Sequence, residues 1–181
     1  LSFSSAQLPA HLTPEKKAAL WLETIANANL RADVDIPDRA NFYGAGKTAI
    51  IGSSTISWGK ANAVRVQRNA RHIALDQNDS VFLLLHNGGG PVGGSQFGRD
   101  VILSDGGAAI FDCKDAQLTQ TRAGGAVFSL HVPRQALSRF GIEIEDHSAR
   151  LIDSRTEALR LLRGYLKILL DTSPHDSAEL A

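Results

Sequence analysis

Histidines are the residues of this chain best suited to metal or acid–base chemistry. There are six, and three of them, His72, His86 and His131, lie in separate segments that we predict to be strands. Neighbouring strands of a β barrel commonly gather two histidines and a carboxylate around a catalytic metal. The chain has no closely spaced His-x-His pair, so a metal site would require these three histidines to converge. A hydrogen-bonded core or pocket histidine is the alternative for each.

Other motifs that carry chemistry are incomplete. Residues 44–48 (GAGKT) match the tail of a phosphate-binding loop, but Asn41 stands where the loop needs its first glycine. Strand-like residues 48–57 follow instead of a helix, so we interpret the motif as a turn before a strand. The glycine-rich residues 88–94 are predicted to be a hairpin connection. A Gly-x-Ser-x-Gly elbow is absent, and nothing in the sequence indicates catalysis.

Composition limits the class of protein. With 181 residues, 43% hydrophobic and 21% charged, the chain is expected to form one globular domain, with at most an appendage. Its formal net charge of zero gives no footprint for nucleic acid or an anionic membrane. No apolar run approaches the roughly 20 residues that span a bilayer. The single cysteine, Cys113, agrees with a cytoplasmic protein and is interpreted as a strand-end residue rather than a reactive thiol.

The N-terminal part of the chain is predicted to be a helix followed by a loop. Thr13 is a good N-cap and Pro14 suits the first helical position, so a helix should run from there to about Asn27. Residues 31–39 are polar and contain a proline, which favours a connecting loop.

The middle of the chain changes to short apolar runs separated by Gly, Asp and Asn turns. This pattern predicts a closed or sandwiched antiparallel β structure. Residues 63–75 alternate polar and apolar side chains, which indicates one long half-buried strand, bent or divided. The other predicted strands cover residues 49–51, 54–58, 81–86, 101–103, 108–111 and 126–132.

Helices are predicted again after residue 134, over 135–140 and 154–171. The apolar residues of 154–171 occupy more than one face, so this helix should pack on two sides. One side would contact its own β structure, and the other a second copy or a missing domain. Residues 173–181 are polar and have the composition of a linker.

A series of short motifs carries a family resemblance. The motifs are residues 66–74 (VQRNARHIA), 81–85 (VFLLL), Gly88, 96–99 (QFGR), 104–107 (SDGG), 111–112 (FD), 128–134 (FSLHVPR) and Leu137. In this order and spacing the chain, from about Phe42 to Asp171, resembles the N-terminal regulatory domain of AraC/XylS-type transcription regulators, in the subgroup with an AraC-binding-like domain.

The resemblance implies a mainly β protein with flanking helices (α+β), in which a cupin-like β barrel senses a small effector without a cofactor. The predicted dimer forms through 154–171, and DNA would be bound only through a C-terminal helix-turn-helix domain, for which nothing after Asp171 is long enough. A cytoplasmic bacterial protein with no membrane contact is expected. The expected units are an N-terminal arm and helix (1–40), the barrel (41–134), the dimerisation segment (135–172) and a linker (173–181).

An effector pocket needs an aromatic wall and a few polar groups on strands. A carboxylate on the effector would suit Arg68 or Arg71. The alternatives are that Arg68 braces the outer surface and that Trp58 belongs to the core. The predicted ligand contacts are Trp58, Arg68, His72, His86 and His131.

Two other functions remain open. The chain could be a stand-alone cupin-type enzyme with a metal held by His72, His86 and His131. It could also be a dimerisation module without a ligand, which the apolar character of 81–85 and 127–132 allows.

Overall fold

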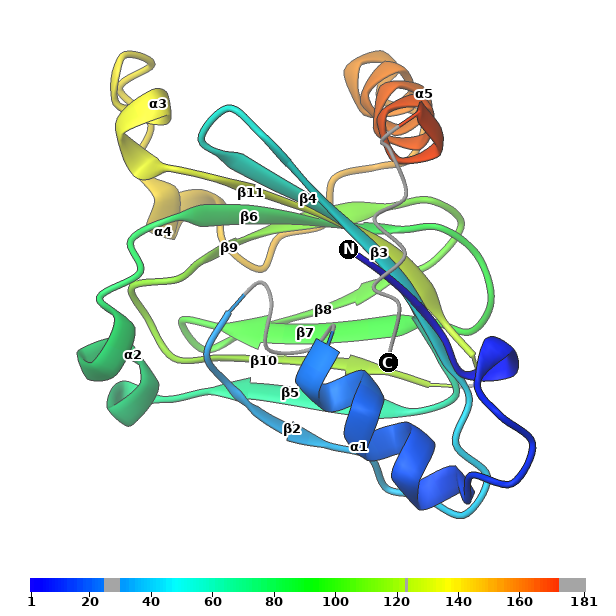
Figure 1. Ribbon diagram of the computed structural model, residues 1–181. Coiled ribbons are helices and arrows are strands. Elements are labelled where there is room, and N and C mark those ends of the chain that lie inside the picture. The colour runs from blue at the N-terminus through cyan, green and yellow to red at the C-terminus, as the bar shows by residue number, and fades with distance from the viewer. Residues whose placement is uncertain (25–29, 123, 173–181) are drawn as a thin grey trace.

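Two antiparallel β sheets face each other in the computed structural model, which describes residues 1–24, 30–122 and 124–172 (Figure 1). The six-stranded sheet has the order β1 (Ser2–Ser4), β3 (Gly44–Ile51), β4 (Ser54–Ala61), β11 (Ala126–Val132), β6 (Val81–His86) and β9 (Ala108–Asp112). The five-stranded sheet has the order β2 (Asp33–Asp35), β5 (Val64–Arg68), β10 (Gln117–Thr121), β7 (Val92–Gln96) and β8 (Arg99–Leu103).

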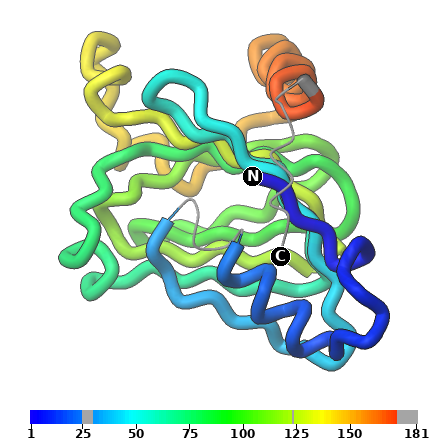
Figure 2. Tube along the Cα trace, viewed as in Figure 1, coloured from blue at the N-terminus to red at the C-terminus, as the bar shows by residue number. Residues whose placement is uncertain are grey.

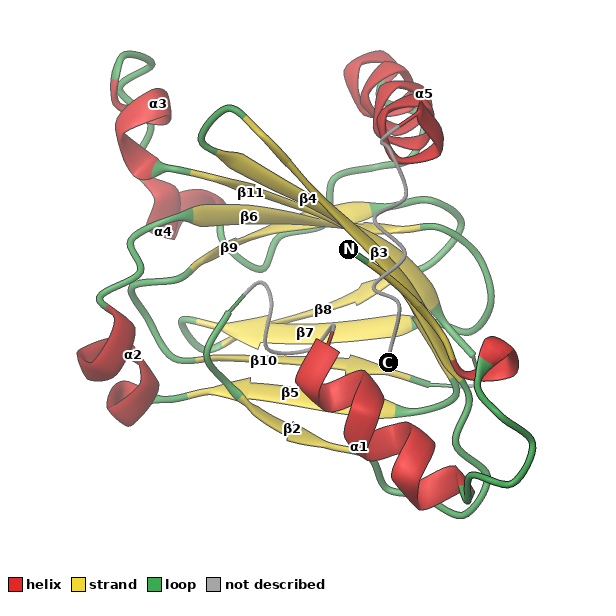
Figure 3. Cartoon of the chain, in the orientation of Figure 1, coloured by secondary structure: helices red, strands yellow, loops and turns green. Residues whose placement is uncertain are grey.

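Helices lie around the sheets rather than between them (Figure 3). They are η1 (Ser5–Gln7), α1 (Pro14–Thr24), α2 (Ala70–Asp76), α3 (Arg134–Ser138), α4 (Ile144–His147) and α5 (Glu157–Thr172). The long C-terminal helix α5 packs on β3 and β4, on the face of the six-stranded sheet that points away from the other sheet. The helix α1 contacts β1 and β3 and lies in the lower part of the trace in Figure 2. No helix in the described parts of the chain is long and apolar enough to span a bilayer.

The predicted α+β class, mainly β with flanking helices, is confirmed, and in the described residues the two sheets form a sandwich that is not closed into the expected barrel. In the described ranges, no strand of one sheet forms a ladder with a strand of the other. The glycine-rich stretch 88–94 is one of the connections between the two sheets. It was predicted to be a hairpin connection, but it carries the chain from β6 in one sheet to β7 in the other, and Gly93 and Gly94 lie within β7, paired with β8 and β10. That prediction is therefore wrong.

The long strand predicted over 63–75 is divided into β5 and α2. The division occurs at Asn69, whose side-chain oxygen accepts hydrogen bonds from the backbone N–H groups of Arg71 (3.0 Å) and His72 (3.4 Å). The Nδ1 atom of His72 in turn accepts from the Asn69 backbone N–H at 3.3 Å. This reciprocal capping box starts a helix where the alternation of polar and apolar residues alone indicated a strand.

Residues 44–48 form the beginning of β3 and not a turn, and no helix follows them. A side chain at Gly44 would collide with the Phe42 ring and lie 3.0 Å from Cδ1 of Trp21, so this glycine allows α1 to pack against the sheet. The predicted loop 31–39 contains the short strand β2, which pairs with β5. The described part of α1 ends at Thr24, and the predicted helix end at Asn27 lies outside the described residues.

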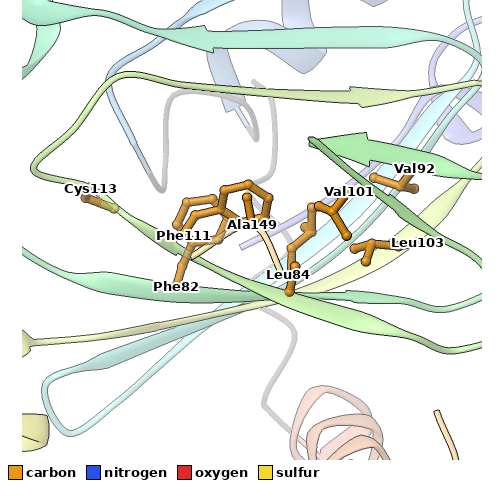
Figure 4. Packing of buried hydrophobic residues seen from close by; sticks show 9 residues of the cluster. Phe82, Leu84, Val92, Val101, Leu103, Phe111, Cys113 and Ala149 are labelled. Atoms are coloured by element: carbon orange, nitrogen blue, oxygen red, sulfur yellow. The ribbon is translucent and has the colours of Figure 1, made fainter. Parts of the chain in front are cut away.

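The core between the sheets is built around aromatic rings (Figure 4). Phe82 of β6 stacks on Phe111 of β9 with ring centroids 5.2 Å apart. Phe111 is fully buried and reaches the opposite sheet at Gly94, where any side chain would overlap its ring. Close packing at this point sets the spacing of the two sheets.

The central strands of the six-stranded sheet are covered on both faces. Phe128 and Leu130 of β11 belong to the apolar cluster under α5, whereas Val127 and His131 face the other sheet. Burial on both faces explains why 81–86 is a continuous apolar run and does not alternate.

Replacement of Gly94 tests the sheet spacing. In Gly94→Ala the new methyl group would overlap the Phe111 ring, so we expect the free energy of unfolding to fall by about 1–3 kcal/mol in urea denaturation. Gly93→Ala is the matched control, because its Cβ meets nothing closer than the Gln120 carbonyl oxygen at 4.0 Å. Equal effects of the two variants would contradict the packing described above.

Candidate functional site in the cavity between the sheets

A cavity of about 180 Å³ lies between the inner faces of the two sheets. The six-stranded sheet contributes residues of β4, β6 and β11, and the five-stranded sheet contributes residues of β5, β7 and β10. Trp21 of α1 also lines it. The walls are mostly apolar, with Val64, Val66, Phe82 and Leu84 among the lining residues. A partly open, mostly apolar space with few polar groups is a usual form of a small-molecule site.

His131 is the predicted site residue with the clearest position in this cavity. It projects from β11, is 8% exposed and stacks on Phe82 with ring centroids 4.9 Å apart. Its Nδ1 atom is buried and has no hydrogen-bond partner. Burial lowers the pKa of His131 from its usual 6.5 to about 4, so the imidazole is neutral near pH 7.

Two further polar residues in the wall were not predicted. Gln117 of β10 is 6% exposed, and both its Nε2 and Oε1 atoms are buried without a hydrogen-bond partner. The indole Nε1 of Trp21 is also buried and unpartnered. Buried polar groups nearly always find a partner, so groups without one mark places where a ligand or water completes the site. No sequence signal separated Gln117 from the other polar residues of 117–121.

Arg68, another predicted contact, is at the cavity wall but fully engaged. Its guanidinium forms a bidentate ion pair with Asp76 of α2 at 2.7 and 2.8 Å. It also donates to the backbone carbonyl oxygens of Arg31 (2.8 Å) and Cys113 (2.9 Å). The hydrogen bonds from the Arg68 guanidinium hold the pKa of the Asp76 carboxyl below its usual value. The arginine therefore joins β5, α2 and the end of β9 from a position that is 1% exposed.

His72 and His86 lie in other environments. The Nε2 of His72, on α2, is 3.3 Å from the Asp33 carboxylate, and its Nδ1 belongs to the capping box. The Nδ1 of His86 accepts from the backbone N–H groups of Gly88 and Gly106, and its Nε2 is 3.2 Å from the Gly90 carbonyl oxygen. His86 thus holds together two turns at one end of the sandwich. Arg71, the alternative carboxylate partner, is exposed and pairs with Asp33 at 3.3 Å.

Trp58 lines part of the cavity and also belongs to the core. Its side chain packs in the cluster under α5, beside Phe128 and Ile56. It also borders a second hollow between α5 and the sheet, lined by Lys47, Lys167 and Asp171 among others. The structure therefore brings Arg68 and His131 to the cavity and separates them from His72 and His86.

Metal-ligating side chains and the single cysteine are further candidates for chemistry at this site. Within residues 1–24, 30–122 and 124–172, no three His, Cys, Asp or Glu side chains are grouped to hold a metal ion. Cys113 is buried, and burial raises the pKa of its thiol to about 11, which keeps it protonated.

One family model matches most of the sequence. The model of the AraC-binding-like domain matches residues 21–181. No curated protein is similar enough in sequence to count as a match.

Comparison with solved structures shows which proteins have a similar fold. The crystal structure of the AraC-like transcriptional activator CuxR superimposes with a TM-score of 0.75 at 14% identity, over 94% of this chain and 60% of CuxR. The chain thus spans less than two thirds of CuxR. A putative ethanolamine utilization protein Q from Salmonella typhimurium gives a TM-score of 0.40 at 6% identity, over 59% of this chain and 98% of that one. A cupin-2 domain protein from Rhodospirillum rubrum gives 0.35 at 12% identity, over 77% and 88%.

Loss of the Asp76 charge should destabilise the chain through Arg68. In Asp76→Asn the buried guanidinium loses its counter-ion, and we expect the free energy of unfolding to fall by about 2–3 kcal/mol. The control is Asp153→Asn, which breaks an exposed ion pair with Arg155 of the same 2.7 Å length and should leave the urea midpoint unchanged. Equal midpoints for the two variants would show that the Arg68 pair has no special structural weight.

His131 should make stability depend on pH. Its pKa is lower in the folded state than in the unfolded state, so the unfolded chain binds more protons between pH 6.5 and 4. Stability is complete above pH 6.5 and decreases as the pH falls through this window. From pH 7 to 5 the unfolding free energy of the wild type should therefore fall by about 2 kcal/mol more than that of His131→Phe. Parallel profiles would refute this, and His131→Gln provides a second variant if the first does not fold.

Proposed function

Because the chain belongs to the AraC-binding-like domain family, we propose that it senses a small molecule, dimerises and controls a DNA-binding domain of an AraC-type transcription regulator. The observation that carries the proposal is the cavity whose buried polar atoms, on Trp21, Gln117 and His131, lack partners. The family and the fold shared with CuxR, a transcriptional activator, support the regulatory role. Since the chain spans 60% of CuxR, the proposed DNA-binding part would be additional to residues 1–181.

Dimerisation is assigned to the exposed face of α5. One face of this helix packs on the sheet through Leu159, Leu166 and Leu170, which are at most 4% exposed. A second face carries Leu161 (69% exposed) and Tyr165 (57%), with Ala158 and Ile168 on the same stripe. Spacings of three and four residues align these side chains along the helix. Large apolar side chains gathered on one exposed helix face are typical of a protein–protein contact.

The occupant of this face is proposed to be a second copy of the same helix. Two α5 helices related by a twofold axis would place the same side chains opposite one another, which satisfies an isologous contact with one surface. The remaining face, with Arg160 and Lys167, would stay in solvent.

Signal transfer is proposed to run through β11. Ligand contacts at His131 and packing contacts of Leu130 and Phe128 under α5 occupy neighbouring positions of one strand. A ligand that binds two arrangements of strand and helix with different affinity would shift their populations and so alter the dimer.

The two alternatives have less support. A metalloenzyme would need His72, His86 and His131 to meet, but the first is committed to a helix cap and the second to two turns. A module without a ligand would leave the unpartnered atoms of Gln117 and His131 unexplained.

The proposed dimer is tested at Tyr165. We expect Tyr165→Glu to raise the dissociation constant of the dimer by about 10–100-fold in sedimentation equilibrium, because a charge would be buried at the contact. Fused to a DNA-binding domain that recognises its operator only as a dimer, the wild-type chain should support repression of a reporter gene and Tyr165→Glu should not.

Arg160→Glu is the matched control, since it places the same side chain on the solvent face of the same helix. It should dimerise and repress like the wild type. A wild-type chain that is monomeric at high micromolar concentration, or a Tyr165→Glu variant that still dimerises, would remove the α5 contact from the proposal.

A further inference from the structure

The charged side chains at the cavity wall leave no net charge for a ligand to meet. Among the lining residues the charged ones are Arg68 and Lys60, and no Asp or Glu is present. Arg68 is neutralised by Asp76 and donates to two carbonyl oxygens. The Lys60 side chain is exposed, and its ammonium group lies 5.9 Å from the Tyr43 ring centroid. An ionised ligand would therefore enter a mostly apolar space without a counter-ion, which is strongly unfavourable.

Gln117 and His131, two of the three described cavity-lining residues with buried, unpartnered polar atoms, lie at one end of the cavity. Gln117 pairs in register with Gln96, whose side chain bonds the backbone of Asp112 at the end of β9. His131 pairs with Phe82, which in turn pairs with Phe111, the residue before Asp112. Gln117 and His131 therefore approach the same end of the sandwich from opposite sheets.

The other end of the cavity lies beside the N-terminal helix and is lined mostly by apolar groups, together with the unpartnered indole Nε1 of Trp21. Trp21 packs there against Phe42, with ring centroids 5.6 Å apart, and belongs to a cluster with Ala61 and Val64. Val64 pairs with Thr121, four residues along β10 from Gln117. Gln117 and His131 thus lie at one end of the cavity and Trp21 at the other.

The volume limits the size of the ligand. A cavity of about 180 Å³ is slightly larger than an apolar cavity of roughly 150 Å³ that is known to accept benzene. One aromatic ring with a short substituent fits this space.

From these features we propose that the cavity selects an uncharged molecule about the size of one aromatic ring. It is apolar over most of its surface and carries one head group that both donates and accepts a hydrogen bond. The head group bonds the Gln117 amide, which offers a donor and an acceptor, and the Nδ1 of His131, while the ring faces the apolar walls and Trp21. This assignment rests on the proposed sensing function and defines the class of effector.

Benzamide and benzoate test the proposal, because they have nearly the same size and shape and differ in charge at pH 7. We expect benzamide to bind the chain with a dissociation constant on the order of 0.1–1 mM, measured by ligand-observed NMR. Benzoate should bind at least tenfold more weakly. In the ¹⁵N-labelled wild type, the side-chain amide signals of Gln117 should shift with benzamide and stay in place with benzoate.

Gln117→Leu should weaken benzamide binding at least fivefold. The control is Gln67→Leu, on the neighbouring strand, because Gln67 is exposed on the outer face of the same sheet. Benzoate binding as tight as benzamide binding, an unchanged affinity in Gln117→Leu, or no benzamide binding at about 10 mM would each overturn the ligand class. The benzamide and benzoate experiments test only the ligand class, whereas Tyr165→Glu tests the α5 dimer without any ligand. Failure of this inference is therefore distinguishable from failure of the proposed function.

Discussion

The burial of β11 on both faces is the constraint on which the rest of the structure depends. Alternate residues of this strand point in opposite directions, so Val127, Ser129 and His131 face the cavity while Phe128 and Leu130 hold α5. Its neighbours β4 and β6 follow the same pattern in register. Because interiors are close-packed, a displacement of this strand on one face must be accommodated on the other. In the proposed function, cavity and dimer helix are coupled by one layer of backbone, without a long path between them.

The buried Arg68 explains why the cavity is neutral. A guanidinium with free donors at this wall would attract carboxylates and phosphates. Instead, Asp76 and the carbonyl oxygens of Arg31 and Cys113 bind it, which turns a residue type associated with anion recognition into a structural joint. The same joint holds α2 against the end of β5. Recognition is therefore left to uncharged groups, and the polarity of the site comes from amide and imidazole atoms.

The sequence predicted those elements whose structure is set by local patterns, and it was less successful where a specific side-chain contact sets the structure. Strands such as 81–86 and 126–132, and the helix start at Pro14, follow from local patterns and are present in the structure. The strand expected over residues 63–75, bent or divided, is present only as β5, because a side-chain cap at Asn69 starts a helix where the alternation continues.

The site depends on contacts that no single segment encodes. His131 and Gln117 lie in different sheets and meet the cavity only because of the register of β11 and β10, which is set by pairing across the chain. The side chains of Trp58 and Phe128 point to α5 for the same reason, although an aromatic residue on a strand fits a pocket wall equally well by type.

The energetics of the proposed switch require that α5 be held only moderately. A ligand at ten times its dissociation constant stabilises the state it binds by about 1.4 kcal/mol. Coupling between sites is typically about 1–3 kcal/mol, so such a ligand redirects a dimer only if two arrangements of α5 differ by a similar amount. The helix is suited to this, since it buries Leu159, Leu166 and Leu170 on its own sheet while Leu161 and Tyr165 stay exposed. A helix that buried all its apolar faces in one protomer would be too firmly packed for so small a ligand to move.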